Sequence, residues 1–116
     1  MLNRGAIILR YREPAIRWIN ETDPAGEQHT ISAGDLRQDC TVYLISEEDA
    51  DGDSAVNKWV ARNFRTLFET ELEGWITEPS LWPKKRTLKL FYQWFDVEYH
   101  SVIVDTVGNE LYDDEA

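Results

Sequence analysis

The strongest candidate for a functional site is a short run of basic and aromatic residues in the last third of the chain. Trp82 is followed by Lys84, Lys85 and Arg86, and Lys89 lies just beyond them. An aromatic anchor beside several cations suits a phosphate, a carboxylate ligand or an acidic peptide. The alternative is that Trp82 fills the core and the cations form a solvated turn. The sequence leaves both interpretations open.

His100 is a second candidate, because it lies in a strand-like segment with Glu98 on the same face. Glu98 could orient the imidazole, and the two could act with the nearby cations on a phosphorylated small molecule. Ser101, the adjacent nucleophile, would point to the opposite face of a strand. Polar neighbours on one face of a strand more often form a solvated sheet edge than a catalytic site. No catalytic residue is therefore assigned.

The acidic loop 49–53 has the spacing of the start of a calcium-binding loop. Its three aspartates alternate with small residues, so their side chains could converge on a hard cation. However, Ser54 stands where such a loop needs Gly, and Val60 stands where it needs a bidentate Glu. The same residues suit the N-terminus of a helix, with Asp53 or Ser54 as its cap. No metal site is predicted here.

Composition indicates one folded domain in a reducing compartment. A chain of 116 residues with 42% hydrophobic residues can bury a core without disulfides. Cys40 is the only cysteine and lies in a strand-like segment, so we expect it to be buried. No signal peptide is recognisable, and no apolar run reaches the ~18 residues that a membrane span needs. We therefore expect a cytoplasmic protein.

Charge is unevenly distributed along the chain. The net charge is −10, which argues against direct binding of nucleic acid. Residues 84–95 nevertheless hold four basic side chains and no acidic one. Four arginines near the N-terminus could extend this basic surface if the first strand ends nearby: Arg4, Arg10, Arg12 and Arg17.

Strands and helices alternate in the pattern of the sequence. Three segments have the short, β-branched composition of strands: 6–11, 40–46 and 97–105, the last centred on Val102–Val104. Three segments carry helix signals: 13–20, 32–39 and 54–72, the last with Gly74 as a stop. Residues 87–94 fit either class, but Phe95-Asp96 offers no turn residues for a hairpin, so a helix is favoured, starting near Ser80 or Pro83.

These elements predict an α+β (or small α/β) fold in the order β-α-α-β-α-α-β. We expect one domain over residues 1–107, with about three strands in a mixed sheet, and an acidic tail over 108–116. The long connections between strands favour parallel or mixed pairing over hairpins. Trp75, Phe91 and Phe95 are expected in the core.

Several short motifs stand out together: Trp75, Ser-Leu-Trp-Pro-Lys-Lys-Arg-Thr at 80–87, Phe91, Trp-Phe-Asp at 94–96 and His-Ser at 100–101. Through these motifs, and through residues 2–4 and 39–45, the chain resembles a family of small bacterial proteins of unknown function. The resemblance covers most of the chain. It implies a bacterial cytosolic setting and no particular activity.

The function that we expect is that of a non-enzymatic binding or regulatory module. It would recognise a protein or a small anionic ligand through the Trp82–Lys89 region. One alternative is a small hydrolase or transferase acting on a phosphorylated small molecule. Another is an acidic surface that mimics nucleic acid and occupies a basic partner. No cofactor, membrane or nucleic-acid partner is expected, and a monomer is assumed.

Overall fold

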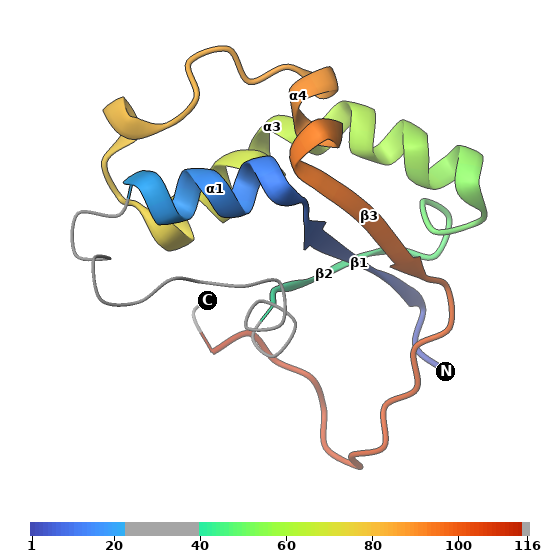
Figure 1. The fold of residues 1–116 in the computed structure, drawn as a ribbon. Coiled ribbons are helices and arrows are strands. Elements are labelled where there is room, and N and C mark those ends of the chain that lie inside the picture. Colours follow the sequence, from blue (N-terminus) through green and yellow to red (C-terminus); the bar gives the residue numbers. More distant parts are fainter. Residues whose placement is uncertain (23–39, 115–116) are drawn as a thin grey trace.

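The structure, a computed structural model, describes residues 1–22 and 40–114. In this part of the chain the elements are β1 (Arg4–Tyr11), α1 (Glu13–Thr22), β2 (Val42–Ser46), α3 (Asp53–Trp75), the 3-10 helix η2 (Pro79–Leu81), α4 (Leu88–Trp94) and β3 (Phe95–His100). A small α+β domain with a three-stranded sheet is therefore confirmed (Figure 1). The helix expected at 32–39 lies outside the described residues.

The three strands form a sheet in the order β2-β1-β3, and both pairs are antiparallel. The chain leaves β2 beside the start of β1, at the pair Arg4–Ser46. α3 then carries it to the other end of the sheet, where β3 begins at the pair Tyr11–Phe95. The expected mixed pairing is wrong, because strand direction depends on the end at which a connection returns the chain and not on its length.

β3 is shorter than expected and begins without a linker after α4. It covers Phe95–His100, whereas a strand had been expected over 97–105. Val102 and Val104 lie beyond it and are 62% and 64% exposed. Their β-branched side chains favour a strand locally, but a strand also needs a continuous ladder, and here the described backbone offers one hydrogen bond, from the Leu2 N–H to the Ile103 carbonyl oxygen at 2.7 Å. The pairing of β3 with β1 ends at Ala6–His100, close to the start of β1.

The core lies between α3 and one face of the sheet. On α3 the buried side chains recur at helical spacing, and they are Val56, Val60, Leu67, Phe68 and Leu72. They face Ile7 and Leu9 of β1 and Phe95 of β3. Phe91 and Phe95 are 0% and 1% exposed, which confirms that prediction. Trp75 was expected in the core but is 37% exposed, because α3 extends past Gly74 and places this residue at its last position.

α4 confirms the helical interpretation of residues 88–94, although its start was expected further upstream. Its cap is Thr87, whose side chain accepts a hydrogen bond from the Leu90 N–H. α3 also differs at its start. Its N-cap is Gly52, with φ 93°, instead of Asp53 or Ser54. At the N-termini of both α3 and α4, the hydrophobic spacing predicted the helix correctly, but the predicted first residue or cap was wrong.

The second face of the sheet is not covered by the described helices. Val42 and Leu44 of β2 are 53% and 51% exposed there. Cys40 is exposed just before β2, so its expected place in the core is wrong. The strand β2 begins at Val42, two residues later than expected, which leaves the thiol outside the packed sheet.

Candidate functional site

Trp82 lies in the loop between η2 and α4 and is partly anchored in the core. Its indole Nε1 donates a hydrogen bond to the Ile76 carbonyl oxygen at 2.8 Å, and its half-buried ring packs against the hydrophobic core. Trp82 therefore fits the first of its two predicted roles, that of a side chain packed against the core. The indole bond ties the start of the following loop to the end of α3.

Arg86 is also engaged by the protein itself. Its Nε and Nη2 reach Glu69 Oε2 at 3.3 and 3.0 Å, and its Nη1 donates to the Pro83 carbonyl oxygen at 2.8 Å. The guanidinium carbon lies 5.8 Å from the centroid of the Trp82 ring. Arg86 thus ties the loop to α3, which reduces the number of donors it can offer to a ligand.

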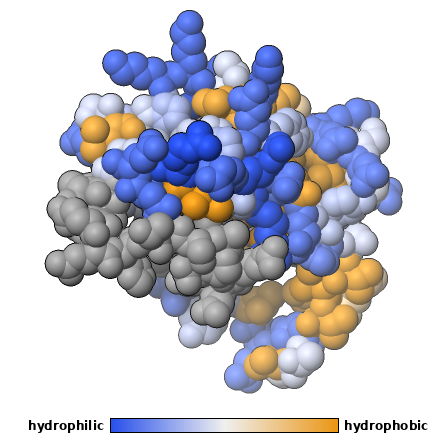
Figure 2. Space-filling model, in the orientation of Figure 1, coloured by the Kyte–Doolittle hydropathy of each residue, from blue (hydrophilic) through white to orange (hydrophobic). Residues whose placement is uncertain are grey.

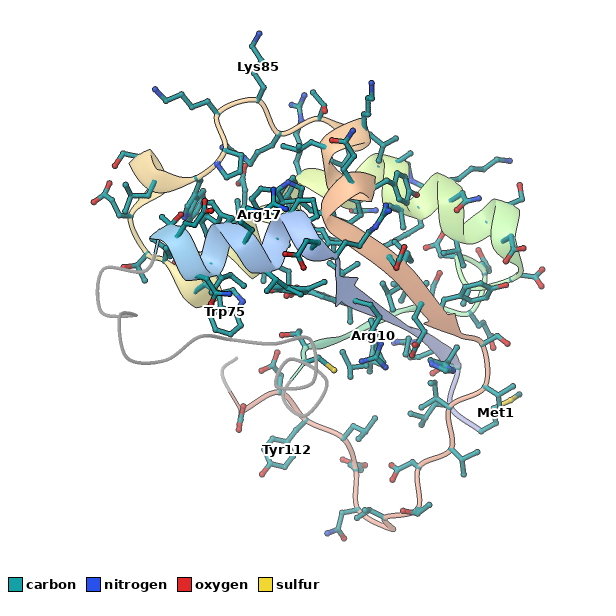
Figure 3. All side chains as sticks on the ribbon, in the orientation of Figure 1. Met1, Arg10, Arg17, Trp75, Lys85 and Tyr112 are labelled. Carbon is teal, nitrogen blue, oxygen red and sulfur yellow. The ribbon has the colours of Figure 1, made fainter. Side chains whose placement is uncertain are left out.

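The three lysines of the region have a different environment. Lys84, Lys85 and Lys89 are exposed, and within the described residues none of their side chains makes a hydrogen bond or an ion pair. Lys85 projects from the loop away from the body of the protein (Figure 3). Strongly hydrophilic side chains project from this edge of the molecule (Figure 2). Within the described residues these three ammonium groups are thus left unpaired.

α1 borders residues 84–89, which carry the three lysines and are called the lysine loop here, with Lys89 in the first turn of α4. The Trp18 Nε1 donates to the Leu81 carbonyl oxygen at 3.1 Å, and Arg12 Nη1 donates to the Tyr92 carbonyl oxygen at 2.7 Å. The end of the first strand therefore does lie near α4, as the basic-surface hypothesis requires. Arg4 does not extend this surface, because it begins β1 and lies about 27 Å along the strand from Arg12.

His100 lies at a different place from the lysines. It ends β3, five residues or about 17 Å along the strand from its junction with α4. One hydrogen bond of 2.8 Å joins its Nε2 to Glu98 Oε2, as their same-face spacing indicates. Arg10 binds the same carboxylate at 3.1 and 3.2 Å and, with His100, lowers the pKa of Glu98. His100 is therefore grouped with Glu98 and Arg10 on the sheet and does not join the 84–89 loop.

The acidic loop directs its carboxylates toward protein groups. Asp49 accepts hydrogen bonds from the Ser46 hydroxyl at 2.8 Å and from Arg62 at 3.2 Å. Asp53 accepts one from the Tyr99 hydroxyl at 2.7 Å, and this bond raises the pKa of that tyrosine. Across residues 1–22 and 40–114, no group of three or more histidine, cysteine or acidic side chains is arranged to hold a metal ion.

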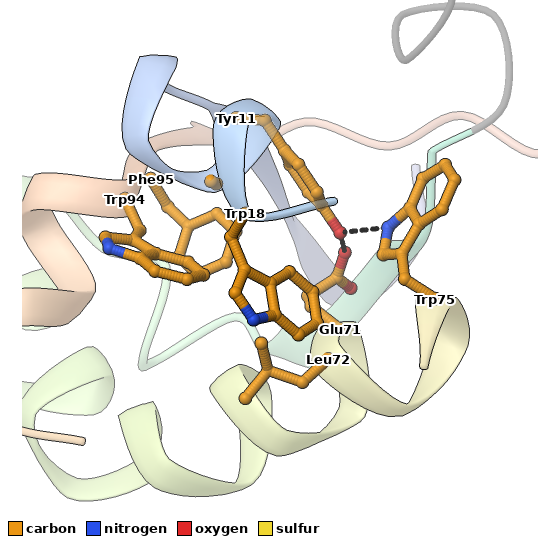
Figure 4. A pocket seen from close by; sticks show the side chains of 8 residues that line it. Tyr11, Trp18, Glu71, Leu72, Trp75, Trp94 and Phe95 are labelled. Carbon is orange, nitrogen blue, oxygen red and sulfur yellow. Dashed lines mark hydrogen bonds between the residues drawn. The ribbon is translucent and has the colours of Figure 1, made fainter. Parts of the chain in front are cut away.

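A cluster that sequence analysis missed is centred on Glu71 of α3 (Figure 4). The Tyr11 hydroxyl donates to Glu71 Oε1 at 2.6 Å, and the Tyr43 hydroxyl donates to Oε2. Tyr11 in turn accepts a hydrogen bond of 2.9 Å from the Trp75 indole. Burial and the neighbouring carboxylate raise the pKa of both tyrosines far above their ordinary value. One carboxylate thereby joins α3 to β1 and β2.

A signal for Glu71 was present in the sequence. It follows Leu67 by four positions and Phe68 by three, so it lies on the buried face of α3. A carboxylate on an apolar helix face needs polar partners. The partners themselves could not be identified, because Tyr11 and Tyr43 are 60 and 28 residues away in the chain.

The chain was compared with family models, with curated proteins and with solved structures, and it matches none of them. The resemblance of the chain to a bacterial family, through residues 2–4, 39–45 and 75–101, therefore stays a prediction. Among the described helices, none combines the length and the apolar character that crossing a bilayer requires.

Proposed function

We propose that the protein is a cytoplasmic binding module that captures an anionic partner, an acidic protein segment or a small anion, through its lysine loop. Lys84, Lys85 and Lys89 provide the charge. Trp82 and Arg86 hold the loop in position. The protein acts without catalysis, in the bacterial setting that the sequence motifs imply.

The observation that supports this proposal most is that residues 82–89 contain both side chains bonded to the protein and side chains that are exposed and unpaired among the described residues. The side chains of Trp82 and Arg86 are fastened to Ile76, Pro83 and Glu69. The lysine side chains beside them are exposed and have no hydrogen-bond or ion-pair partner in the described part of the chain. A fixed loop that presents unpaired cations loses little conformational freedom when it binds an anion. In an otherwise acidic protein, such a loop also steers an acidic partner to one place.

The proposal predicts a localised, salt-sensitive response to anions. In amide NMR spectra of the full chain, we expect a short polyglutamate peptide to shift the signals of residues 84–89. The double variant Lys84→Glu with Lys85→Glu should weaken binding by about tenfold or more, because attraction becomes repulsion at a solvent-exposed site. Raising the salt concentration should weaken binding by the parent chain as well.

The matched control changes the same number of charges elsewhere. Arg4→Glu with Lys58→Glu reverses two exposed cations, one at the start of β1 and one in the first half of α3. Binding by this control should stay within about twofold of the parent. The proposal fails if the control loses as much affinity as the loop variant. It also fails if neither the peptide nor inorganic phosphate shifts the loop signals.

A further inference from the structure

Residues 110–114, called the acidic segment here, combine acidic and apolar side chains on an exposed stretch of the chain. They read Glu-Leu-Tyr-Asp-Asp, with no basic residue among them. The side chains of Leu111 and Tyr112 are 64% and 87% exposed, and neither belongs to the core formed by the described residues. An exposed apolar pair beside carboxylates suits docking on a basic surface that also offers apolar contact.

The lysine loop has the complementary composition. Lys84, Lys85 and Lys89 present three exposed ammonium groups, and the acidic segment carries three carboxylates. Just before the loop, Leu81 is 44% exposed and the Trp82 ring is half-buried. Apolar contact matters here, because ion pairs between solvent-exposed groups contribute little by themselves. The loop and the segment therefore match in charge and in apolar character.

The acidic segment and the lysine loop of one chain lie far apart. Figure 3 shows Lys85 and Tyr112 on opposite sides of the molecule. β3 begins beside α4 and ends at His100, about 17 Å further along the strand. The acidic segment starts ten residues after that end. In this conformation the segment of one chain does not meet its own loop, and the loop of a second copy is open to it.

The other acidic region, residues 47–53, is a poorer match for the lysine loop. Its Asp49 carboxylate is bonded to Ser46 and Arg62, and its Asp53 carboxylate accepts a hydrogen bond from a tyrosine. Ala50 is its one apolar residue and is buried. Residues 47–53 therefore offer charge to a second copy but no apolar side chain.

We propose that the acidic segment of one copy binds the lysine loop of a second copy, so that the protein recognises itself. This inference rests on the proposed function of the lysine loop and names its partner. Carboxylates of the segment meet the lysine ammonium groups, while Leu111 and Tyr112 pack beside Leu81. Each copy contributes two different surfaces, so the contact is head-to-tail and can join more than two copies.

Two peptides of equal charge test the recognition of the segment by the full chain. One has the sequence of residues 110–116, and the other carries Leu111→Ser with Tyr112→Ser. Both should shift the amide NMR signals of residues 84–89, because both carry the same carboxylates. The unaltered peptide should bind about threefold more tightly or better, since only it offers the apolar pair. Equal affinities would overturn the proposal.

Self-recognition also predicts a reversible association of the full chain at low salt. In sedimentation velocity at about 0.02 to 1 mM protein, the weight-average mass should rise above the 13.6 kDa of one chain. Over the same range, the amide signals of residues 84–89 should move in the direction that the unaltered peptide causes. Added salt should reverse both effects, because the contact depends on exposed charges.

An exchange of charges between two variants assigns the contact to these surfaces. The loop variant Lys84→Glu with Lys85→Glu and the segment variant Glu110→Lys with Asp114→Lys should each associate about tenfold more weakly. An equimolar mixture of the two should associate again, because each acidic surface then meets a basic one.

The matched control reverses two exposed acidic residues elsewhere. Glu47→Lys with Glu48→Lys makes the same change of net charge as the segment variant and should associate within about twofold of the parent. Amide spectra establish that every variant retains the fold. A control that loses as much association as the segment variant would overturn the proposal, and so would a mixture that fails to associate.

Two further results separate this inference from the proposed function. If the parent stays monomeric at every concentration while polyglutamate still shifts the loop signals, the loop binds anions but not its own chain, and only this inference fails. If polyglutamate shifts nothing either, both fail. Loop signals that differ between the parent and the segment variant at every concentration, without association, would show the segment bound to its own loop and would overturn binding to a second copy.

Discussion

At the scale of single residues, Glu69 and Glu71 show how position on one helix decides the role of a carboxylate. They stand two positions apart on α3, which rotates them by about 200° relative to each other. Glu69 is 45% exposed and pairs with Arg86 at 3.0 Å. Glu71 instead faces the sheet and accepts hydrogen bonds from two tyrosines. Glu69 thus connects α3 to the lysine loop, whereas Glu71 connects α3 to the sheet.

The tyrosines bound to Glu71 predict a loss of stability in alkaline solution. Burial and the carboxylate raise the pKa of Tyr11 and Tyr43 in the folded state, whereas unfolding restores ordinary values near 10. Their contribution is complete below about pH 10 and is lost as the pH rises further. Above that pH the free energy of unfolding should fall by up to about 1.4 kcal/mol per pH unit for each tyrosine.

Urea unfolding between neutral pH and about pH 11 measures this slope. Tyr43→Phe removes one of the two groups, so the alkaline slope should become shallower. Tyr112→Phe changes an 87% exposed tail residue and serves as the control, with the slope of the parent. An equally steep slope in Tyr43→Phe would contradict the prediction.

At the scale of elements, α4 is a short helix on which the lysine loop depends. It has seven residues, so its own hydrogen bonds give it little independent stability. Packing holds it in place: Phe91 is fully buried, and the Trp94 ring lies 5.7 Å from that of Trp18. The helix also passes directly into β3, so a disturbed α4 would disturb an edge of the sheet.

Removal of the α4 cap should therefore be measurable. Thr87→Ala deletes the acceptor of the Leu90 N–H bond of 3.1 Å. Loss of an N-cap typically costs about 1 kcal/mol, and urea unfolding should show this decrease. Thr106→Ala makes the same change at an exposed position after β3 and should alter stability by less than about 0.5 kcal/mol. Equal effects of the two variants would argue against the capping role.

At the scale of the whole molecule, one layer of helices covers one face of a three-stranded antiparallel sheet. The aromatic core sits between the layers, with Phe68 packed 5.4 to 5.8 Å from Phe91, Trp94 and Phe95. The lysine loop lies above this core at one end (Figure 1). Beyond β3 the chain continues with exposed apolar and acidic residues, which include Val107 and Leu111 at 63% and 64% exposure.

If residues 1–107 form the domain and 108–116 a tail, as the sequence predicts, a truncated chain should keep its fold. A chain that ends at Val107 loses the acidic segment 108–116 and no described strand or helix. We expect the free energy of unfolding to change by less than about 1 kcal/mol, since most surface residues contribute little. Thermal or urea unfolding measures this change, and amide NMR checks residues 1–105. A larger loss of stability would show that the tail belongs to the domain.

The sequence by itself determined the elements whose signals are local. The apolar stripe of α3 is visible over several turns, and the absence of turn residues at Phe95-Asp96 correctly favoured a helix before it. Phe91 and Phe95 were recognised as core residues. The cluster of cations at 84–89 was also evident. Each of these features depends on neighbours within a few positions, so hydropathy spacing and turn chemistry are sufficient to reveal them.

Only the tertiary structure decided which distant groups meet. Val102 and Val104 have strand character, yet the ladder between β1 and β3 ends at the pair Ala6–His100, and beyond it the described residues keep one backbone hydrogen bond, from the Leu2 N–H to the Ile103 carbonyl oxygen. Arg86 pairs with Glu69, which is 17 residues away in the sequence. This ion pair distinguishes Arg86 from the neighbouring lysines. Glu71 meets Tyr11 across 60 residues of sequence. Strand pairing and charge pairing bring together residues that local patterns cannot relate, because their energy depends on distance in space.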